Sequence, residues 1–257
     1  MIVGFAGSGN MAGAIARGLV RSGSVPEAML FADSGSGRAD ALAAELGGER
    51  VATLDELADR SDIVFLAVKP AALEAVGPQL AGRAGAIISV LGATPVERLR
   101  EAFGPTPVLR VMPNLAVEIG SGVICHAPAP DRAPEIAAVL DLLAGLGSVI
   151  EVPEDELDAA TAVMGCAPAY VALAAGAIAE AGVAAGLDPG LSARLVRESV
   201  EGVGRHLATR APGPMQEAIA SPGGSTEAGL EVLADRAAAA AFAAAVEASL
   251  QRMAGSE

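Results

Sequence analysis

Three small residues near the N-terminus have the spacing of a dinucleotide-binding loop. Gly7, Gly9 and Ala12 match the pattern G-x-G-x-x-G/A directly after the apolar run Ile2–Ala6. The first glycine permits a tight turn, the second lets the backbone approach a pyrophosphate, and the third small residue lets helix and strand pack closely. The pyrophosphate would lie at the helix N-terminus, where free N–H groups favour anions. The candidate cofactor loop therefore comprises Gly7, Ser8, Gly9, Asn10 and Met11.

The residues after the second apolar run bear on the choice between NAD and NADP. Asp33 ends that run and could hydrogen-bond the adenosine ribose diol of NAD. Ser34, Ser36 and Arg38 follow it and could bind the 2′-phosphate of NADP, which Asp33 would repel unless its side chain turns away. The sequence supports both cofactors. We expect NADP(H), with NAD(H) as the alternative.

Lys69 is the only lysine of the chain, and it directly follows the apolar run Ile63–Val68. In open α/β sheets, ligands bind at the carboxyl ends of strands, which is where this lysine is expected. The alternative interpretation is an ordinary surface lysine at a helix start.

A second candidate site is the segment Ser221-Pro-Gly-Gly-Ser-Thr226. Its Pro-Gly-Gly sequence predicts a tight turn, and a helix is expected immediately afterwards. Free N–H groups at such a helix start suit a carboxylate, and Thr226 in the first turn could donate its hydroxyl to a ligand. A capped helix start that binds nothing is the alternative.

Two kinds of domain must position these residues. In the first part of the chain, short apolar runs alternate with helical segments, which is typical of a parallel sheet covered on both faces. We therefore predict a doubly wound α/β domain over residues 1–152. The predicted strands are Ile2–Ala6, Ala28–Ala32, Ile63–Val68, Ala86–Leu91, Val108–Met112, Gly122–His126 and Ser148–Val152.

From residue 153 to residue 257 the sequence predicts an all-helical domain. Within it, the 21 residues from Ala159 to Ala179 carry no charge and could span a bilayer by length. Pro168 would break such a span near its middle. We therefore expect a helix that is buried inside a domain or a subunit interface, most simply in a homodimer, and no membrane partner.

Composition excludes several other classes of protein. The 257 residues are 52% hydrophobic and carry a formal charge of −14, which disfavours disorder and binding to nucleic acid or anionic membranes. Cys125 and Cys166 are too few for a disulfide framework, and the N-terminus lacks the basic region of a signal peptide, so we expect a cytoplasmic protein. His126 and His206 belong to no cluster with metal-ligand spacing, so we expect no metal.

Five motifs occur in an order that resembles one known family. They are Gly7-Ser-Gly-Asn-Met11, Ala67-Val-Lys-Pro70, Met112-Pro-Asn114, Gly165-Cys-Ala-Pro-Ala-Tyr170 and Ser221-Pro-Gly-Gly-Ser-Thr226. Over essentially its whole length the chain resembles Δ1-pyrroline-5-carboxylate reductase. The resemblance implies an N-terminal Rossmann domain, a helical domain that interleaves with a second subunit, and higher rings of dimers as a further possibility. It also implies reduction of a cyclic imine to L-proline by NAD(P)H.

The same resemblance assigns roles to individual residues. It implies that Ala67, Val68 and Lys69 line the nucleotide, that Asn114 lies near the nicotinamide, and that Thr226 hydrogen-bonds the ring nitrogen of the substrate. The substrate carboxylate would be held at the turn formed by Ser221, Gly223, Gly224 and Ser225.

Two departures from the family pattern leave the substrate's ring size open. Met164 and Cys166 stand where the family usually has serines, and Leu115 and Ala116 follow Asn114 where it usually has Thr-Pro. A six-membered cyclic imine is therefore one alternative substrate, and a non-catalytic nucleotide-binding paralogue is another reading. A β-hydroxyacid dehydrogenase is disfavoured, because that family uses a lysine in its helical domain and this domain has none.

Overall fold

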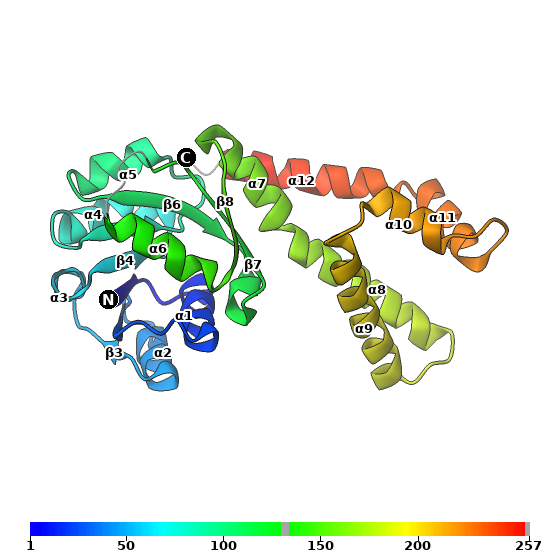
Figure 1. Cartoon of the computed structure of the whole chain (residues 1–257), viewed down its shortest axis with the longest axis horizontal. Helices are drawn as coiled ribbons and strands as arrows, with labels where there is room; N and C mark the ends of the chain where they lie inside the picture. Colours follow the sequence, from blue (N-terminus) through cyan, green and yellow to red (C-terminus); the bar gives the residue numbers. More distant parts are fainter. Residues whose placement is uncertain (130–133, 255–257) are drawn as a thin grey trace. The chain divides into compact units, whose positions relative to one another are not determined.

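The computed structural model describes residues 1–129 and 134–254. These residues form two compact units (Figure 1). The first contains Met1–Gly165 and the end of the last helix, and the second contains Cys166–Ser249. Each unit is considered by itself below.

In the first unit the described residues form an eight-stranded sheet in the order β3-β2-β1-β4-β5-β6-β7-β8. The chain runs from β1 outward to β3 and then returns to β4 on the other side of β1, so the strand order reverses between β1 and β4. Ligands of open α/β sheets bind at such a switch point, at the carboxyl ends of the strands. The strands are β1 (Ile2–Ala6), β2 (Ala28–Ala32), β3 (Glu49–Arg50), β4 (Ile63–Leu66), β5 (Ala86–Ser89), β6 (Val108–Pro113), β7 (Gly122–His126) and β8 (Gly147–Glu151).

The seven predicted strands are confirmed, and each observed boundary lies within two residues of the predicted one. Strand β3 was missed because two exposed residues carry no hydrophobic pattern. The helices of this unit are α1 (Asn10–Ser22), α2 (Arg38–Leu46), α3 (Leu54–Arg60), α4 (Leu73–Leu80), α5 (Val96–Phe103), α6 (Pro134–Ala144) and α7 (Leu157–Met164), with short 3₁₀ turns η1 (Pro70–Ala72), η2 (Leu115–Ile119) and η3 (Glu154–Glu156).

Helices cover both faces of the sheet, as predicted. One face packs against α1, α2 and α6, and the other packs against α3, α4 and α5 (Figure 1). On the first face, Phe5 stacks against Phe31 and Phe65 on its two neighbouring strands, with ring centroids 5.1 and 5.3 Å apart. This aromatic row crosses β2, β1 and β4, and thereby fixes the register of the strands that carry the switch point.

Strand β7 corrects the prediction of a wholly parallel sheet. It runs antiparallel to β6, with Val111 opposite His126 and Pro113 opposite Ile124, whereas β8 is parallel to β7. The physical reason is the connection, because only residues 114–121 join β6 to β7. A parallel pairing needs a crossover of about a dozen or more residues.

Helix α7 is attached to β6 near both of its ends. Arg110 of β6 is buried, and its guanidinium contacts Asp158 at 2.8 Å and Glu154 at 3.5 Å. Glu154 also accepts a hydrogen bond from the amide of Val96, the first residue of α5. At the other end of α7, the side chain of Asn114 contacts the backbone of Met164. These bonds hold α7 near both of its ends, and its apolar side packs against β6 and β7.

The second unit is entirely helical in the described residues, as predicted. It contains α8 (Ala167–Ala184), α9 (Pro189–Leu207), α10 (Pro212–Ile219), α11 (Ser225–Asp235) and most of α12 (Ala238–Ala254). Asp188 caps α9 by accepting a hydrogen bond from the amide of Leu191 at 3.0 Å. The hydroxyl of Tyr170 joins α8 to α12 through Ser249 at 2.7 Å and the carbonyl of Ala245 at 3.2 Å.

Of the long uncharged run Ala159–Ala179, the chain itself buries only Ala162. Within the described residues, no residue of α8 is buried, and Leu173 is 73% exposed. The stretch Glu154–Ala184 has the length and hydropathy of a membrane span, but α7 ends at Met164 and α8 begins at Ala167. For α8, burial within its own domain is therefore wrong as a prediction, whereas burial in a subunit interface stays a prediction.

Candidate functional site

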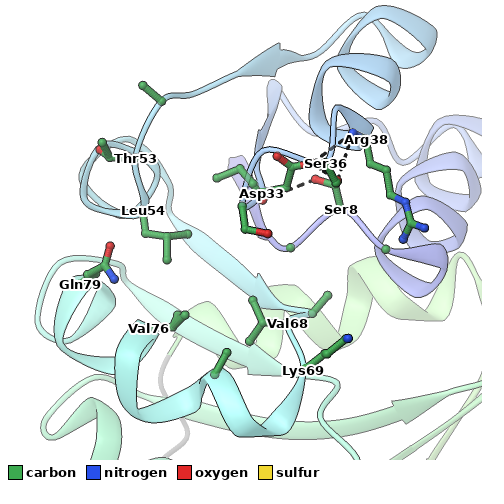
Figure 2. A pocket seen from close by; sticks show the side chains of 17 residues that line it. Ser8, Asp33, Ser36, Arg38, Thr53, Leu54, Val68, Lys69, Val76 and Gln79 are labelled. Atoms are coloured by element: carbon green, nitrogen blue, oxygen red, sulfur yellow. Dashed lines mark hydrogen bonds between the residues drawn. The ribbon is translucent and has the colours of Figure 1, made fainter.

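A cavity of about 690 Å³ opens at the carboxyl ends of β1, β2 and β4 (Figure 2). It lies at the switch point of the sheet, where the sequence predicts cofactor binding. Its walls come from the glycine loop, the loop after β2, the loop after β4, the beginning of α3, and α4. The residues that line it are Gly7, Ser8, Gly9, Ala32, Asp33, Ser34, Ser36, Arg38, Ala52, Thr53, Leu54, Ala67, Val68, Lys69, Ala72, Val76 and Gln79.

The glycine loop has the geometry that its motif requires. Gly7 has a φ of +94°, and a Cβ atom there would lie 2.6 Å from the carbonyl oxygen of Ala67. At Gly9 a Cβ atom would meet nothing within 4 Å, so the backbone is open on the side that an approaching phosphate would use. Helix α1 begins at Asn10 with Gly9 as its N-cap residue. The loop therefore fits a pyrophosphate on shape and on the direction of the helix dipole.

The carboxylate of Asp33 organises the loop after β2. Its Oδ1 accepts from the amide of Gly35 at 2.9 Å, and its Oδ2 accepts from the Ser36 hydroxyl and from the amides of Arg38 and Ala39, both at 3.1 Å. The Ser36 hydroxyl, followed by these amides, lowers the pKa of the Asp33 carboxyl, although partial burial acts in the opposite direction. This carboxylate is ionised at neutral pH, and its hydrogen bonds are directed into its own loop.

Two cations face the cavity from opposite walls. The guanidinium of Arg38 extends from the start of α2, and the ammonium of Lys69 extends from the loop after β4 (Figure 2). Among the described residues, neither side chain has a carboxylate within ion-pair distance. The Asp33 carboxylate is hydrogen-bonded within its own loop. The two positive charges of Arg38 and Lys69 therefore suit a ligand that carries several phosphates.

One part of the cavity is apolar, and most of its residues belong to no sequence motif. Leu54, Val68 and Val76 supply its walls, and Thr53 and Gln79 lie beside them (Figure 2). Such a slot fits a flat aromatic ring with polar edges, such as adenine. Apart from Val68, these residues lie on α3, on α4 or at their starts and have no motif, so only the packing of those helices against the sheet brings them together.

Three of the predicted cofactor residues do not line the cavity. Asn10 is exposed at the first position of α1, and Met11 packs partly against the sheet core. Asn114 is buried, and both ends of its side-chain amide are occupied. Its Nδ2 donates to the carbonyl of Met164 at 3.0 Å, and its Oδ1 accepts from the amide of Val123 at 3.2 Å. Its predicted position near the nicotinamide stays a prediction, although it does follow the carboxyl end of β6.

The second candidate site is a turn followed by a helix, within the helical unit. Gly223 has a φ of +72°, and the amide of Gly224 donates to the carbonyl of Ser221 at 2.9 Å. A Cβ atom at Gly224 would lie 2.8 Å from the backbone carbonyl oxygen of Ser221, so this position favours glycine. Helix α11 starts at Ser225, which places the exposed hydroxyl of Thr226 in its first turn, as predicted.

Glu227 occupies one of the amides that the family resemblance assigns to the substrate. Its Oε2 accepts from the amide of Gly223 at 2.7 Å. Since the amide of Gly224 is also paired, Ser225 and Thr226 are left with amides that have no acceptor inside the helix. A carboxylate could therefore bind at the helix start, as the residues predict, but not at the amides of Gly223 and Gly224 that the family resemblance implies.

His126 and the two cysteines are buried or half-buried. The ring of His126 on β7 is buried, and its Nδ1 lies 2.9 Å from the carbonyl oxygen of Ala127. Burial raises the pKa of the Cys125 thiol, while Cys166 is half-buried before α8. Across residues 1–129 and 134–254, no group of three His, Cys, Asp or Glu side chains could hold a metal ion.

Each of the two units matches a known family model. Residues 154–255 match the family model described as pyrroline-5-carboxylate reductase dimerisation, and residues 2–92 match the model described as NADP oxidoreductase, coenzyme F420-dependent. The chain is 34% identical to the pyrroline-5-carboxylate reductase of Thermus thermophilus over 98% of its length and 97% of the relative's.

Two solved structures are similar to this chain over nearly its whole length. The 1-pyrroline-5-carboxylate reductase of Streptococcus pyogenes superposes with a TM-score of 0.89 at 30% identity, and 98% of each chain is covered. The pyrroline carboxylate reductase of Plasmodium falciparum, solved with NADP bound, gives a TM-score of 0.87 at 27% identity, covering 98% of this chain and 97% of that one.

Proposed function

The chain belongs to the pyrroline-5-carboxylate reductase family, and from that premise we propose that it reduces Δ1-pyrroline-5-carboxylate to L-proline, the last step of proline biosynthesis. The observation that carries the proposal is full-length similarity combined with a cavity, lined by the glycine loop, at the switch point of the sheet. In this activity NAD(P)H supplies a hydride to the carbon of the C=N bond.

Within this proposal, the first unit binds the dinucleotide through groups already described. The amides around Gly7–Met11 and the start of α1 hold the pyrophosphate, and Lys69 adds a positive charge from the opposite wall. The apolar slot between Leu54 and Val76 receives the adenine. Asn114 is hydrogen-bonded to Met164 and Val123 and thereby fixes the end of β6 at this edge of the sheet.

The cofactor is proposed to be NADP(H). The carboxylate of Asp33 is turned into its own loop, which removes the usual ribose-binding group of NAD enzymes from use. Ser34 and Arg38 are exposed at the same wall and can donate to a 2′-phosphate. NAD(H) is the alternative that the assay must exclude.

The turn before α11 is proposed to bind the substrate. Free amides at Ser225 and Thr226, with Ser221, Gly223 and Gly224 shaping the turn, would hold the substrate carboxylate. The hydroxyl of Thr226 would hydrogen-bond the ring nitrogen, which gains a proton as the imine becomes an amine. Positioning supplies most of the rate enhancement in such a reaction, because neither a nucleophile nor a metal is needed.

The active form is proposed to be a cytoplasmic homodimer, with higher rings of dimers as a further possibility. The match to a dimerisation domain over residues 154–255 supports the dimer, and so do the exposed apolar side chains of α8. A dimer would bury a surface that is unfavourable in water. Sedimentation as a monomer at micromolar concentration would contradict this part of the proposal.

The test of the proposed reaction compares two cofactors and two substrates. NADPH and NADH oxidation is followed with Δ1-pyrroline-5-carboxylate and with its six-membered homologue, and the amino-acid product is identified by mass. We expect proline as the main product and NADPH as the better reductant. Faster turnover of the six-membered imine would instead favour the alternative that Met164 and Cys166 leave open, and cofactor binding without any turnover would overturn the assignment.

A further inference from the structure

We propose that Asp33 is a positioning residue that selects NADP(H) by holding the loop of residues 34–38 in shape, and that it does not bind the ribose itself. This inference rests on the proposed function, because it concerns the adenosine end of the same cofactor. An aspartate at the end of β2 ordinarily indicates the opposite preference, since its carboxylate would accept from the ribose diol of NAD.

The hydrogen-bonding capacity of the carboxylate is the first step of the argument. An ionised carboxylate has about four lone-pair sites on its two oxygens. Asp33 receives four hydrogen bonds from its own loop, one on Oδ1 and three on Oδ2, from Gly35, Ser36, Arg38 and Ala39. Little capacity remains for the two hydroxyls of a ribose diol.

The shape of the loop is the second step. Gly35 and Gly37 have φ values of +93° and +76°, so the chain makes two left-handed turns in three residues. Such a loop has no regular backbone hydrogen bonds of its own, and the Asp33 carboxylate supplies the acceptor that its amides need. Figure 2 shows the result: Asp33 and Ser36 face each other, while the side chain of Arg38 extends along the cavity wall.

Charge is the third step. The four donors surround the negative charge of Asp33 and thereby reduce its repulsion of a nearby phosphate. The guanidinium of Arg38 lines the cavity and has no carboxylate partner within the described chain. A planar guanidinium suits a phosphate because it can donate two parallel hydrogen bonds. The loop that Asp33 holds is therefore a candidate binding site for a phosphate on the 2′ position of adenosine.

The two roles of Asp33 predict opposite effects of the Asp33→Asn substitution. If Asp33 binds ribose and repels a 2′-phosphate, removal of its charge will strengthen binding of the phosphorylated adenosine relative to the unphosphorylated one. If Asp33 holds the loop, the amide group will present donors to amides that need an acceptor, and binding of the phosphorylated adenosine will weaken.

The experiment measures equilibrium binding by calorimetry with two fragments of the cofactors, adenosine 2′,5′-bisphosphate and AMP, on the full chain. No turnover is needed. For Asp33→Asn we expect the Kd for the bisphosphate to rise at least about tenfold and the Kd for AMP to change less than about twofold. Ser36→Ala, which removes one donor but keeps the carboxylate, should move the same ratio in the same direction by a smaller factor.

The control is Asp40→Asn, which removes an exposed carboxylate from the first turn of α2. It should leave both constants unchanged, and circular dichroism should show that all variants are folded. A ratio that shifts toward the bisphosphate in Asp33→Asn, or stays unchanged in both Asp33→Asn and Ser36→Ala, would overturn the inference. Failure of the unaltered chain to bind either fragment would instead count against the proposed function.

Discussion

The side-chain amide of Asn114 donates a hydrogen bond to the backbone carbonyl of Met164 at a distance of 3.0 Å. Asn114 directly follows β6, and Met164 is the last residue of α7, so this bond joins the cofactor edge of the sheet to the end of the helix that leads out of the first unit. The same side chain accepts from Val123 on β7. One buried amide thus holds three elements together.

Asn114→Ala should lower the free energy of unfolding by about 1–3 kcal/mol, because it leaves a partly buried carbonyl and a partly buried amide without partners. Urea denaturation monitored by circular dichroism measures this change. The matched control is Asn10→Ala, at the exposed first position of α1, which should change stability by less than about 0.5 kcal/mol. Equal stability of the two variants would show that the amide of Asn114 is not a structural clamp.

Ala93→Gly should stabilise the protein. Ala93 lies between β5 and α5 with a φ of +52°, a left-handed conformation that costs a residue with a Cβ atom about 1–2 kcal/mol. Part of the gain is lost to the greater freedom of glycine in the unfolded chain, so we expect a net increase of about 0.5–1 kcal/mol. Ala44→Gly, on the exposed side of α2, should instead cost about 1 kcal/mol. Thermal unfolding of the two variants distinguishes these opposite signs.

Thr226→Ala should reduce kcat/KM for Δ1-pyrroline-5-carboxylate by about 10²-fold, the effect of losing one preorganised donor. Binding of NADPH, measured by fluorescence, should not change, because Thr226 does not line the cofactor cavity. Thr226→Ser keeps the hydroxyl and should recover most of the activity. Wild-type kinetics in Thr226→Ala would exclude this residue as the partner of the ring nitrogen.

Glu227→Gln should lower KM for the same substrate. The Glu227 carboxylate accepts from the amide of Gly223, beside the amides that would bind the substrate carboxylate. Two like charges about 4 Å apart in water repel by about 1 kcal/mol, which corresponds to about fivefold in KM. Steady-state kinetics should show this decrease with little change in kcat. Glu231→Gln, one turn further along α11, serves as the control, and an identical effect there would point to a general change of charge.

Leu173→Glu should dissociate the proposed dimer. Leu173 is the most exposed large apolar residue of α8, and an unpaired charge in its place would cost at least about 3 kcal/mol if a partner subunit covers it, or roughly 10²-fold in the dissociation constant. Sedimentation velocity measures this shift. Val25→Glu makes a similar change at an exposed valine of the first unit and should leave the sedimentation coefficient unaltered.

The strands and the glycine loop could be predicted because their signals are local. Apolar runs such as Ile2–Ala6 and Ile63–Leu66 are recognisable without their neighbours, and Gly7 and Gly9 have a fixed spacing within a strand–turn–helix context. The direction of β7 was also readable in principle, since the connection from Pro113 to Gly122 is too short for a parallel crossover.

Other features depend on contacts between distant residues and were not predictable. The direction in which the Asp33 side chain turns is decided by the backbone of residues 35–39, and the sequence supports either direction. The partners of Asn114, at Val123 and Met164, follow from the packing of β7 and α7. The exposure of α8 cannot be read from its composition, because a helix buried in its own domain and one buried by a second subunit have the same apolar sequence.

The reversal of β7 decides at which edge of the sheet the chain leaves the first unit. Each strand–helix repeat of a parallel sheet ends its strand at the cofactor edge, so a helix after a parallel eighth strand would carry the chain away from that edge. Because β7 and β8 run the other way, β8 ends at the opposite edge, and α7 travels back along β6 from Asp158 beside Arg110 to Met164 beside Asn114. Helix α7 therefore ends at the same edge of the sheet as the cofactor cavity, whereas a helix after a parallel eighth strand would end at the opposite edge.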